Sequence, residues 1–162
     1  MKYDKLIVNA SPIIALANIG YADLLLQLTN KLLIQRGVYE EINFHKYSDC
    51  ASEWIKNIDH SFIHEVKVSQ MISDWNLGKG ESQVLSLSYI NACIPVVIDD
   101  RAAKKCAEVF NIKVLGTISI IVRAKKLLLI RECKPLFYAL KANGFRISDN
   151  IIDTALELTG EI

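Results

Sequence analysis

The sequence predicts a single α/β domain built around a mostly parallel sheet. Short apolar segments alternate with helical segments along the 162 residues, which is the pattern of repeated strand–helix–strand units. The run Ile94–Ile98 is apolar and rich in β-branched residues, as expected of a strand buried on both faces. Because domains usually span roughly 100–200 residues, we expect residues 1–162 to form one domain.

The first half of the chain alternates predicted strands with helices. The strand Leu6–Val8 leads to Asn9, and we expect Ser11 to cap the next helix with Pro12 at its first position. The other predicted elements here are helices over Ile13–Ile19 and Ala22–Leu28 broken at Gly20, a strand at Leu32–Ile34, a helix after Gly37 through Val38 and Ile42, a helix at Ala51–Ile58 and a strand at Ile63–Val68.

The second half continues the alternation around the buried strand Ile94–Ile98. Ser148 is a good N-cap and Gly160 a good stop signal, so they delimit a last helix over Ser148–Leu158. The remaining predicted elements are helices at Glu81–Ala92, Ala102–Phe110, Ser119–Lys126 and Lys134–Ala142, and a strand at Lys113–Leu115.

Composition excludes several classes of protein. Hydrophobic residues make up 51 % of the chain, which argues against a disordered protein. No apolar stretch approaches the roughly 20 residues that cross a bilayer, and the N-terminus lacks a signal-peptide pattern, so we expect a cytoplasmic protein without a membrane partner. The 4 cysteines show neither disulfide nor zinc spacing and are expected to be free thiols, mostly buried. Glycine-rich nucleotide-binding motifs are absent from the sequence.

Charge is distributed unevenly, although the net charge is only +1. Residues 1–100 carry 12 acidic and 8 basic side chains, whereas residues 101–162 carry 6 acidic and 11 basic ones. An acidic first half can hold cations and a basic second half can face phosphate, although ordinary surface charge is an equally simple explanation.

Acidic and amide side chains follow the predicted strands at one edge of the sheet. Asn9 ends the first strand, and Asp99 and Asp100 end the strand Ile94–Ile98. Ligand sites of parallel sheets lie at the carboxyl ends of the strands, where the crossover helices begin. Glu81 occupies the first turn of such a helix, and Glu41 borders the inward stripe of its own helix, while its neighbour Glu40 is expected to face water.

Carboxylates gathered at one edge would repel one another unless a cation neutralised them. Mg²⁺ and Mn²⁺ prefer oxygen ligands, can activate water and can contact phosphate, so this set predicts hydrolysis of phosphodiesters. The alternative is structural, because Glu near a helix N-terminus favours the helix dipole and Asp after a strand commonly caps the next helix.

Four segments, in this order and spacing, resemble the PIN-domain family and, more narrowly, PIN-like proteins related to VapC-type toxins. The segments are Val8–Ile13, Gly37–Ile42, Gly78–Ser82 and Ile98–Ala103, and Gly116–Thr117, Arg123–Lys126 and Asn143–Ser148 also match. The resemblance implies a three-layer α/β/α sandwich and a Mg²⁺- or Mn²⁺-dependent endoribonuclease. Its acidic positions fall on Asn9, Glu41, Glu81 and Asp100, with Asp99 adjacent, and Asn9 stands where the family pattern has Asp.

The resemblance also implies the partners of such an enzyme. These are RNA, a second copy of the chain in a homodimer and, for a toxin of a toxin–antitoxin pair, a small antitoxin protein. We expect Glu41, Glu81, Asp99 and Asp100 to be catalytic and, with Asn9, to hold the metal, and we expect RNA contacts from Ser11, Lys79, Arg101, Lys104 and Lys105. The alternative function is a non-catalytic nucleic-acid-binding or regulatory protein on the same fold.

Overall fold

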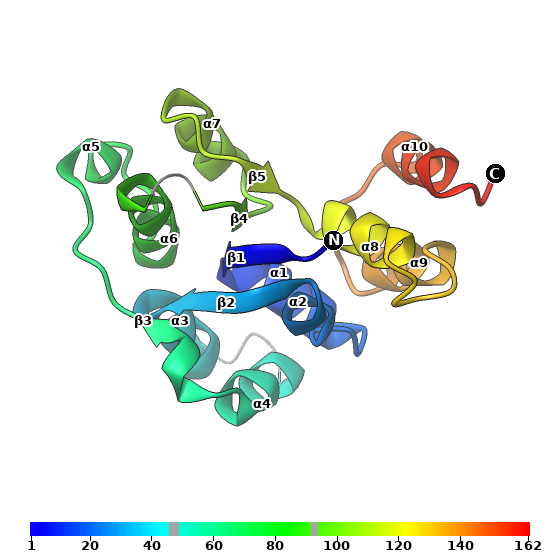
Figure 1. Cartoon of the computed structure of the whole chain (residues 1–162), viewed down its shortest axis with the longest axis horizontal. Coiled ribbons are helices and arrows are strands. Elements are labelled where there is room, and N and C mark those ends of the chain that lie inside the picture. Colours follow the sequence, from blue (N-terminus) through cyan, green and yellow to red (C-terminus); the bar gives the residue numbers. More distant parts are fainter. Residues whose placement is uncertain (46–48, 92–93) are drawn as a thin grey trace.

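The computed structural model describes residues 1–45, 49–91 and 94–162, and its centre is a five-stranded sheet with the order β3-β2-β1-β4-β5. Every pairing in this sheet is parallel, as predicted (Figure 1). The strands are β1 (Tyr3–Val8), β2 (Thr29–Gln35), β3 (Ile63–His64), β4 (Val96–Val97) and β5 (Val114–Leu115).

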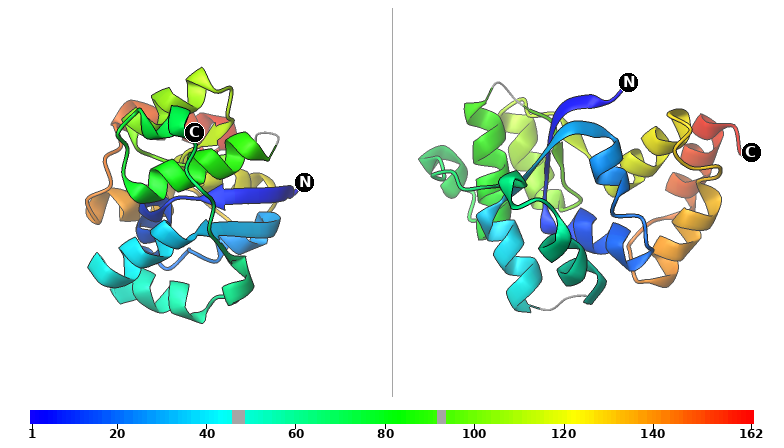
Figure 2. Two further views of the ribbon diagram at one scale, coloured as in Figure 1. Left: turned by 90° about the vertical axis from the view of Figure 1, so that its left-hand side faces the viewer. Right: turned by 60° about the horizontal axis from the view of Figure 1, so that its bottom comes forward.

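Helices connect the strands and cover both sides of the sheet, so the fold is the α/β/α sandwich that the sequence predicted. In Figures 1 and 2, α5 and α6 stand on one side of β1 and β2, whereas α8, α9 and α10 gather on the other. The helices are α1 (Ala10–Asn18), α2 (Leu24–Gln27), α3 (Arg36–His45), α4 (Asp49–Asn57), α5 (Gln70–Ser73), α6 (Lys79–Ile90), α7 (Arg101–Val109), α8 (Thr117–Lys126), α9 (Lys134–Ala142) and α10 (Asp149–Thr159), with a 3₁₀ turn at His60–Phe62. Within the described ranges, none of these helices is long and apolar enough to span a bilayer.

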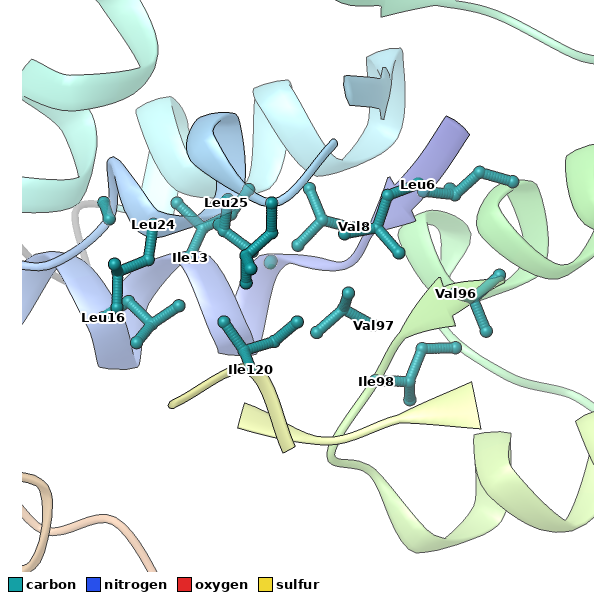
Figure 3. Packing of buried hydrophobic residues seen from close by; sticks show 14 of the residues in the cluster. Leu6, Val8, Ile13, Leu16, Leu24, Leu25, Val96, Val97, Ile98 and Ile120 are labelled. Atoms are coloured by element: carbon teal, nitrogen blue, oxygen red, sulfur yellow. The ribbon is translucent and has the colours of Figure 1, made fainter. Parts of the chain in front are cut away.

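The hydrophobic core lies where the central strands meet α1 and α8. Leu6, Val8 and Val97 are fully buried and pack with Ile13 and Ile120 from these two helices (Figure 3). Central parallel strands covered on both faces bury both sets of alternate side chains, which explains why their sequences are continuously apolar.

The start of α1 differs from the prediction. The N-cap is Asn9, with extended backbone (φ −85°, ψ 171°), and not Ser11, which lies inside the first turn. The side chain of Asn9 makes no capping hydrogen bond. Asn9 therefore links the end of β1 directly to the start of α1, and its side-chain amide takes no part in capping the helix.

The edge strand β3 is shorter than the predicted strand Ile63–Val68. Its only ladder partner is β2, and the last pair in that register joins Gln35 to His64. Because α3 begins at Arg36, no strand continues alongside the residues after His64. The sequence pattern beyond His64 was suitable for a strand, but it had no neighbour with which to pair.

The last two helices agree closely with the prediction. α9 has the predicted bounds, and the Ser148 hydroxyl caps α10 by accepting a hydrogen bond from the Ile151 N–H at 3.3 Å. Gly160 ends α10 in the left-handed conformation (φ +70°), which glycine adopts without strain.

The cysteines that the structure describes are free thiols. Cys106 and Cys133 are buried and Cys50 is exposed, whereas Cys93, like the predicted helix end at Ala92, lies outside the described residues. Burial raises the pKa of Cys106, and burial together with the nearby Glu161 carboxylate raises the pKa of Cys133 to about 12. These two thiols therefore stay protonated and serve as packing groups.

Candidate functional site

The two central strands bring three of the predicted site residues to one edge of the sheet. β1 and β4 are neighbours in register, with Val8 opposite Val97. The backbone N–H of Asn9 continues this ladder by donating to the Val97 carbonyl at 3.0 Å. Asn9 therefore leaves the sheet beside the segment that carries Asp99 and Asp100, as the strand-end argument predicted.

Asn9 and Glu41 converge on the backbone of Gly80. A Cβ atom placed on Gly80 would lie 3.6 Å from Asn9 Oδ1 and 3.4 Å from Glu41 Oε2, so both oxygen atoms face the same point. Asn9 is only 1 % exposed, and its Oδ1 has no hydrogen-bond partner among the described residues. An unpartnered buried oxygen costs about 1–3 kcal/mol and is uncommon in folded proteins. A ligand between these two side chains would satisfy it.

Glu41 reaches this point because the first turns of α3 and α6 touch. The Gly37 N–H donates to the buried side-chain oxygen of Gln83 at 2.7 Å. A Cβ atom at Gly37 would lie 2.6 Å from that oxygen and 3.3 Å from the Gly80 nitrogen, so a larger residue would displace the Gln83 side chain and crowd the start of α6. The contact holds α3, and with it Glu41, against the start of α6.

Glu81 lies in the first turn of α6, as predicted, and shares a cavity with Glu41. This cavity has a volume of about 340 Å³ and is also lined by Gly80, Lys79 and Phe44. We call it the α3–α6 cavity. It places two of the four predicted carboxylates around one space, next to the amide of Asn9.

Asp99 and Asp100 both cap helices. Asp99 Oδ1 accepts a hydrogen bond from the Thr117 N–H at 2.9 Å, and its Oδ2 accepts one from the Thr117 hydroxyl at 2.5 Å. Asp100 is the N-cap of α7, and its Oδ2 accepts from the Ala103 N–H at 2.8 Å. Helix capping, the structural alternative raised from the sequence, is therefore part of the role of these two side chains. Each carboxylate still retains further lone pairs.

The predicted RNA-binding residues occupy different surroundings. Lys79 is ion-paired with Glu40 at 3.0 Å, so Glu40 has a partner and does not simply face water. Lys104 Nζ and Asp99 Oδ1 lie 3.9 Å and 3.2 Å from the position of a Cβ on Gly116. The side chains of Arg101 and Lys105 on α7 are exposed, as is Ser11 on α1.

The donor set suits a hard divalent cation only in part. Asn9 Oδ1 and Glu41 Oε2 fit, because Mg²⁺ is commonly held by one or two protein oxygens and keeps several waters. Across residues 1–45, 49–91 and 94–162, however, no group of three or more His, Cys, Asp or Glu side chains is arranged to hold a metal. Asn9 supplies an amide oxygen and is therefore a donor outside these four residue types.

Three residues at this edge were not assigned a role from the sequence. Gly80 lines the approach of Asn9 and Glu41, Gln83 ties α3 to α6, and Thr117 holds Asp99. Gly80 and Thr117 lie in segments that resemble the PIN family, but the resemblance gave neither of them a function. Gln83, a polar residue beside Val84 and Leu85, was the available signal for a buried polar contact of α6.

A family model described as a PIN domain matches residues 5–161, nearly the whole chain. No curated protein and no solved structure shows a significant match to it. The all-parallel sheet, the strand order and the polar residues at the carboxyl ends of β1 and β4 agree with this assignment. PIN domains are commonly nucleases that act on nucleic acids with divalent metals. The chain belongs to the PIN-domain family.

Proposed function

We propose that the chain is a Mg²⁺- or Mn²⁺-dependent endoribonuclease that hydrolyses RNA phosphodiester bonds. The observation that carries this proposal is the buried, unpartnered Oδ1 of Asn9, which faces the same point as Glu41 Oε2. Asn9 and Glu41 would hold the ion, with Glu81, Asp99 and Asp100 as the further catalytic carboxylates of the site. When bound, a divalent ion supplies charge neutralisation at a phosphate and activation of water.

The side chains around the site have separate roles in this proposal. Glu41 and Glu81 line the α3–α6 cavity with carboxyl groups, and Thr117 fixes the orientation of Asp99. Arg101, Lys104 and Lys105 on α7 attract the RNA backbone, and Lys79 can do so when it leaves Glu40. Ser11 contributes a hydroxyl group at the start of α1.

A labelled RNA incubated with the purified protein tests the proposal. We expect cleavage in Mn²⁺ or Mg²⁺, none in EDTA, and a loss of at least about 100-fold in Glu41→Gln and in Asp100→Asn, as for other groups that act in the transition state. Glu53→Gln, an exposed glutamate on α4, is the matched control and should cleave as wild type. Cleavage that persists in EDTA would refute the metal-dependent mechanism.

The second candidate is a non-catalytic nucleic-acid-binding or regulatory protein on the PIN fold. The capping hydrogen bonds of Asp99 and Asp100, together with the uncharged Asn9, favour it. This candidate predicts RNA that binds but is not cut in either metal. The same assay therefore separates the two functions when binding is measured beside cleavage.

We also propose that the nuclease is cytoplasmic, forms a homodimer and is the toxin of a toxin–antitoxin pair, silenced by a small antitoxin protein. The resemblance to VapC-type toxins supports these assignments. Expression in a bacterial host should slow growth with the wild-type chain and not with Glu41→Gln at equal protein level. Light scattering of the purified chain should give twice the mass of 18.2 kDa, and a monomer would refute the dimer.

A further inference from the structure

A second cavity of about 400 Å³ opens between α1 and the turn after α9. One wall is a single face of α1, where Ser11, Ala15 and Asn18 follow helical spacing. The opposite wall comes from Asn143 and Phe145. We call it the α1–α9 cavity, and its volume lies in the range of about 300–1,000 Å³ that holds organic ligands.

The α1–α9 cavity adjoins the candidate active site, because Glu41 contributes to the lining of both cavities. Glu41 belongs to the lining of the α1–α9 cavity and also to that of the α3–α6 cavity. Ser11, at the same end, lies two residues after Asn9. A group bound in the α1–α9 cavity would therefore be next to anything that Asn9 and Glu41 hold.

The backbone holds Phe145 at the cavity wall. Gly144 adopts φ +86°, which a residue with a side chain rarely does, and this turns the chain back after α9. The turn is closed by the Gly144 N–H donating to Lys141 O at 3.1 Å and the Phe145 N–H donating to Leu140 O at 3.0 Å. Such a closed helix terminus fixes the backbone of Phe145, and the partly buried ring packs against the hydrophobic core, which lowers the cost of ordering it on binding.

The chemistry of the lining fits a neutral, flat and partly polar group. Ile14, Ala15 and Leu140 provide apolar surface beside the Phe145 ring, while Ser11, Asn18 and Asn143 provide hydroxyl and amide groups. Glu41 is the one ionisable side chain among the described residues of this lining. A phosphate would be repelled there, whereas an uncharged nucleobase would be accommodated by stacking and hydrogen bonding at its edge.

We propose that the α1–α9 cavity binds one unstacked RNA base, stacked on Phe145, beside the point that Asn9 and Glu41 face. The inference rests on the proposed function, since it names a base subsite beside the residues of that site. A base paired in a duplex cannot enter such a cavity without leaving its stack.

Fluorescence anisotropy with a labelled six-nucleotide RNA in EDTA, where the proposed reaction does not proceed, tests the base site. Phe145→Leu keeps apolar volume but removes the ring, and we expect binding to weaken by about 5- to 100-fold, the range for loss of one base–aromatic stack. Phe145→Trp should bind as well as wild type. Tyr138→Leu, an exposed aromatic of α9 outside the cavity lining, is the matched control and should also bind as wild type.

An abasic substitution in the RNA completes the test without relying on a variant that must fold. A series of RNAs carries a single abasic nucleotide, each at a different position. At least one of them should bind wild type more weakly than the intact RNA does, by the same factor as the Phe145→Leu substitution. The same RNA should bind Phe145→Leu as tightly as the intact RNA does. Equal binding of all the abasic RNAs, or duplex RNA bound as tightly as single strands, would overturn the base site.

The two proposals can fail separately. Cleavage by wild type with no dependence on Phe145 would remove the base site and leave the nuclease. Phe145-dependent binding of single strands without cleavage would keep the base site and remove the nuclease.

Discussion

The carboxylate of Asp99 is held by two hydrogen bonds from the same residue, Thr117. The backbone N–H of Thr117 donates at 2.9 Å and its hydroxyl donates at 2.5 Å. This pair joins the end of β4 to the start of α8, where exposed N–H groups favour a negative charge. Asp99 thus stabilises the fold at the place where PIN-type chemistry would use it, and any role toward metal must be compatible with this contact.

Thr117→Val should lower the free energy of unfolding by about 1–3 kcal/mol. The change keeps the shape and the N–H but removes a hydroxyl that is fully buried and bonded to a charged acceptor. Urea denaturation measures the loss. Thr154→Val is the control, because the Thr154 hydroxyl is exposed and bonds only to Asn150 O of its own helix. Equal stability of the two variants would show that the Asp99–Thr117 contact contributes nothing.

Asn9→Asp should lower the melting temperature in EDTA and restore or exceed wild-type stability in Mn²⁺. In EDTA the new carboxylate is buried and faces the same point as Glu41, so the two charges repel each other. For scale, two like unit charges about 4 Å apart repel by roughly 4 kcal/mol at an effective dielectric of about 20, before relaxation. A divalent cation reverses the sign of this effect, and a net gain of about 1–2 kcal/mol would tighten metal binding on the order of tenfold.

Thermal melts of wild type and Asn9→Asp in EDTA, Ca²⁺, Mg²⁺ and Mn²⁺ measure this reversal. Asn30→Asp, at an exposed position of β2 outside both cavities, controls for the added charge. If Asn9→Asp shifts the melting temperature equally with and without metal, Asn9 is only a turn residue.

Gly80→Ala should leave the fold intact but weaken any stabilisation by Mn²⁺. The new methyl group would contact Val38 Cγ2 at 3.3 Å and occupy the point that Asn9 Oδ1 and Glu41 Oε2 face. Replacing glycine within a helix gains up to about 1 kcal/mol of helix propensity, which offsets much of this crowding in EDTA. The readout is the Mn²⁺-induced rise in melting temperature, compared with wild type. A full rise in Gly80→Ala would place the metal elsewhere.

Glu161→Gln should lower the free energy of unfolding by about 1–2 kcal/mol at neutral pH. The carboxylate of Glu161 accepts from the N–H of Cys133 at 2.7 Å and from that of Lys134 at 3.0 Å, so it satisfies the start of α9 from the far end of the chain. Denaturant titration checks the value, with Glu157→Gln, an exposed residue of α10, as the control.

The lowered pKa of Glu161 predicts how the free energy of unfolding depends on pH. Burial raises the pKa of Glu161, but the hydrogen bonds from Cys133 and Lys134 and the charge of Lys125 outweigh it, so the pKa lies below its usual 4.5. A carboxyl group whose pKa is lowered by folding contributes its full stabilisation above pH 4.5. This stabilisation is lost as the pH falls through the pKa of the folded state. Wild type should therefore lose stability more steeply than Glu161→Gln below about pH 4.5; parallel curves would contradict the contact.

The elements that could be predicted are those governed by local chemistry. Ser148 and Gly160 set the ends of α10 through capping and a left-handed turn, and both effects act within a few residues. By contrast, Ser11 was a wrong N-cap for α1. The residue types Ser and Pro favour a cap at Ser11. However, the Asn9 N–H pairs with the Val97 carbonyl, which keeps the backbone of Asn9 extended and makes Asn9 the N-cap.

The sequence by itself determined the parallel α/β fold and the common edge of Asn9, Asp99 and Asp100, because apolar runs fix where strands end and parallel strands end together. Only the tertiary structure decided what those side chains touch. Asp99 meets Thr117 across 18 residues of chain, and Glu41 and Asn9 both face Gly80 because α3 and α6 approach each other there. Such contacts depend on distances between elements that no local propensity encodes, so the sequence could place these residues at one edge of the sheet but could not predict their partners.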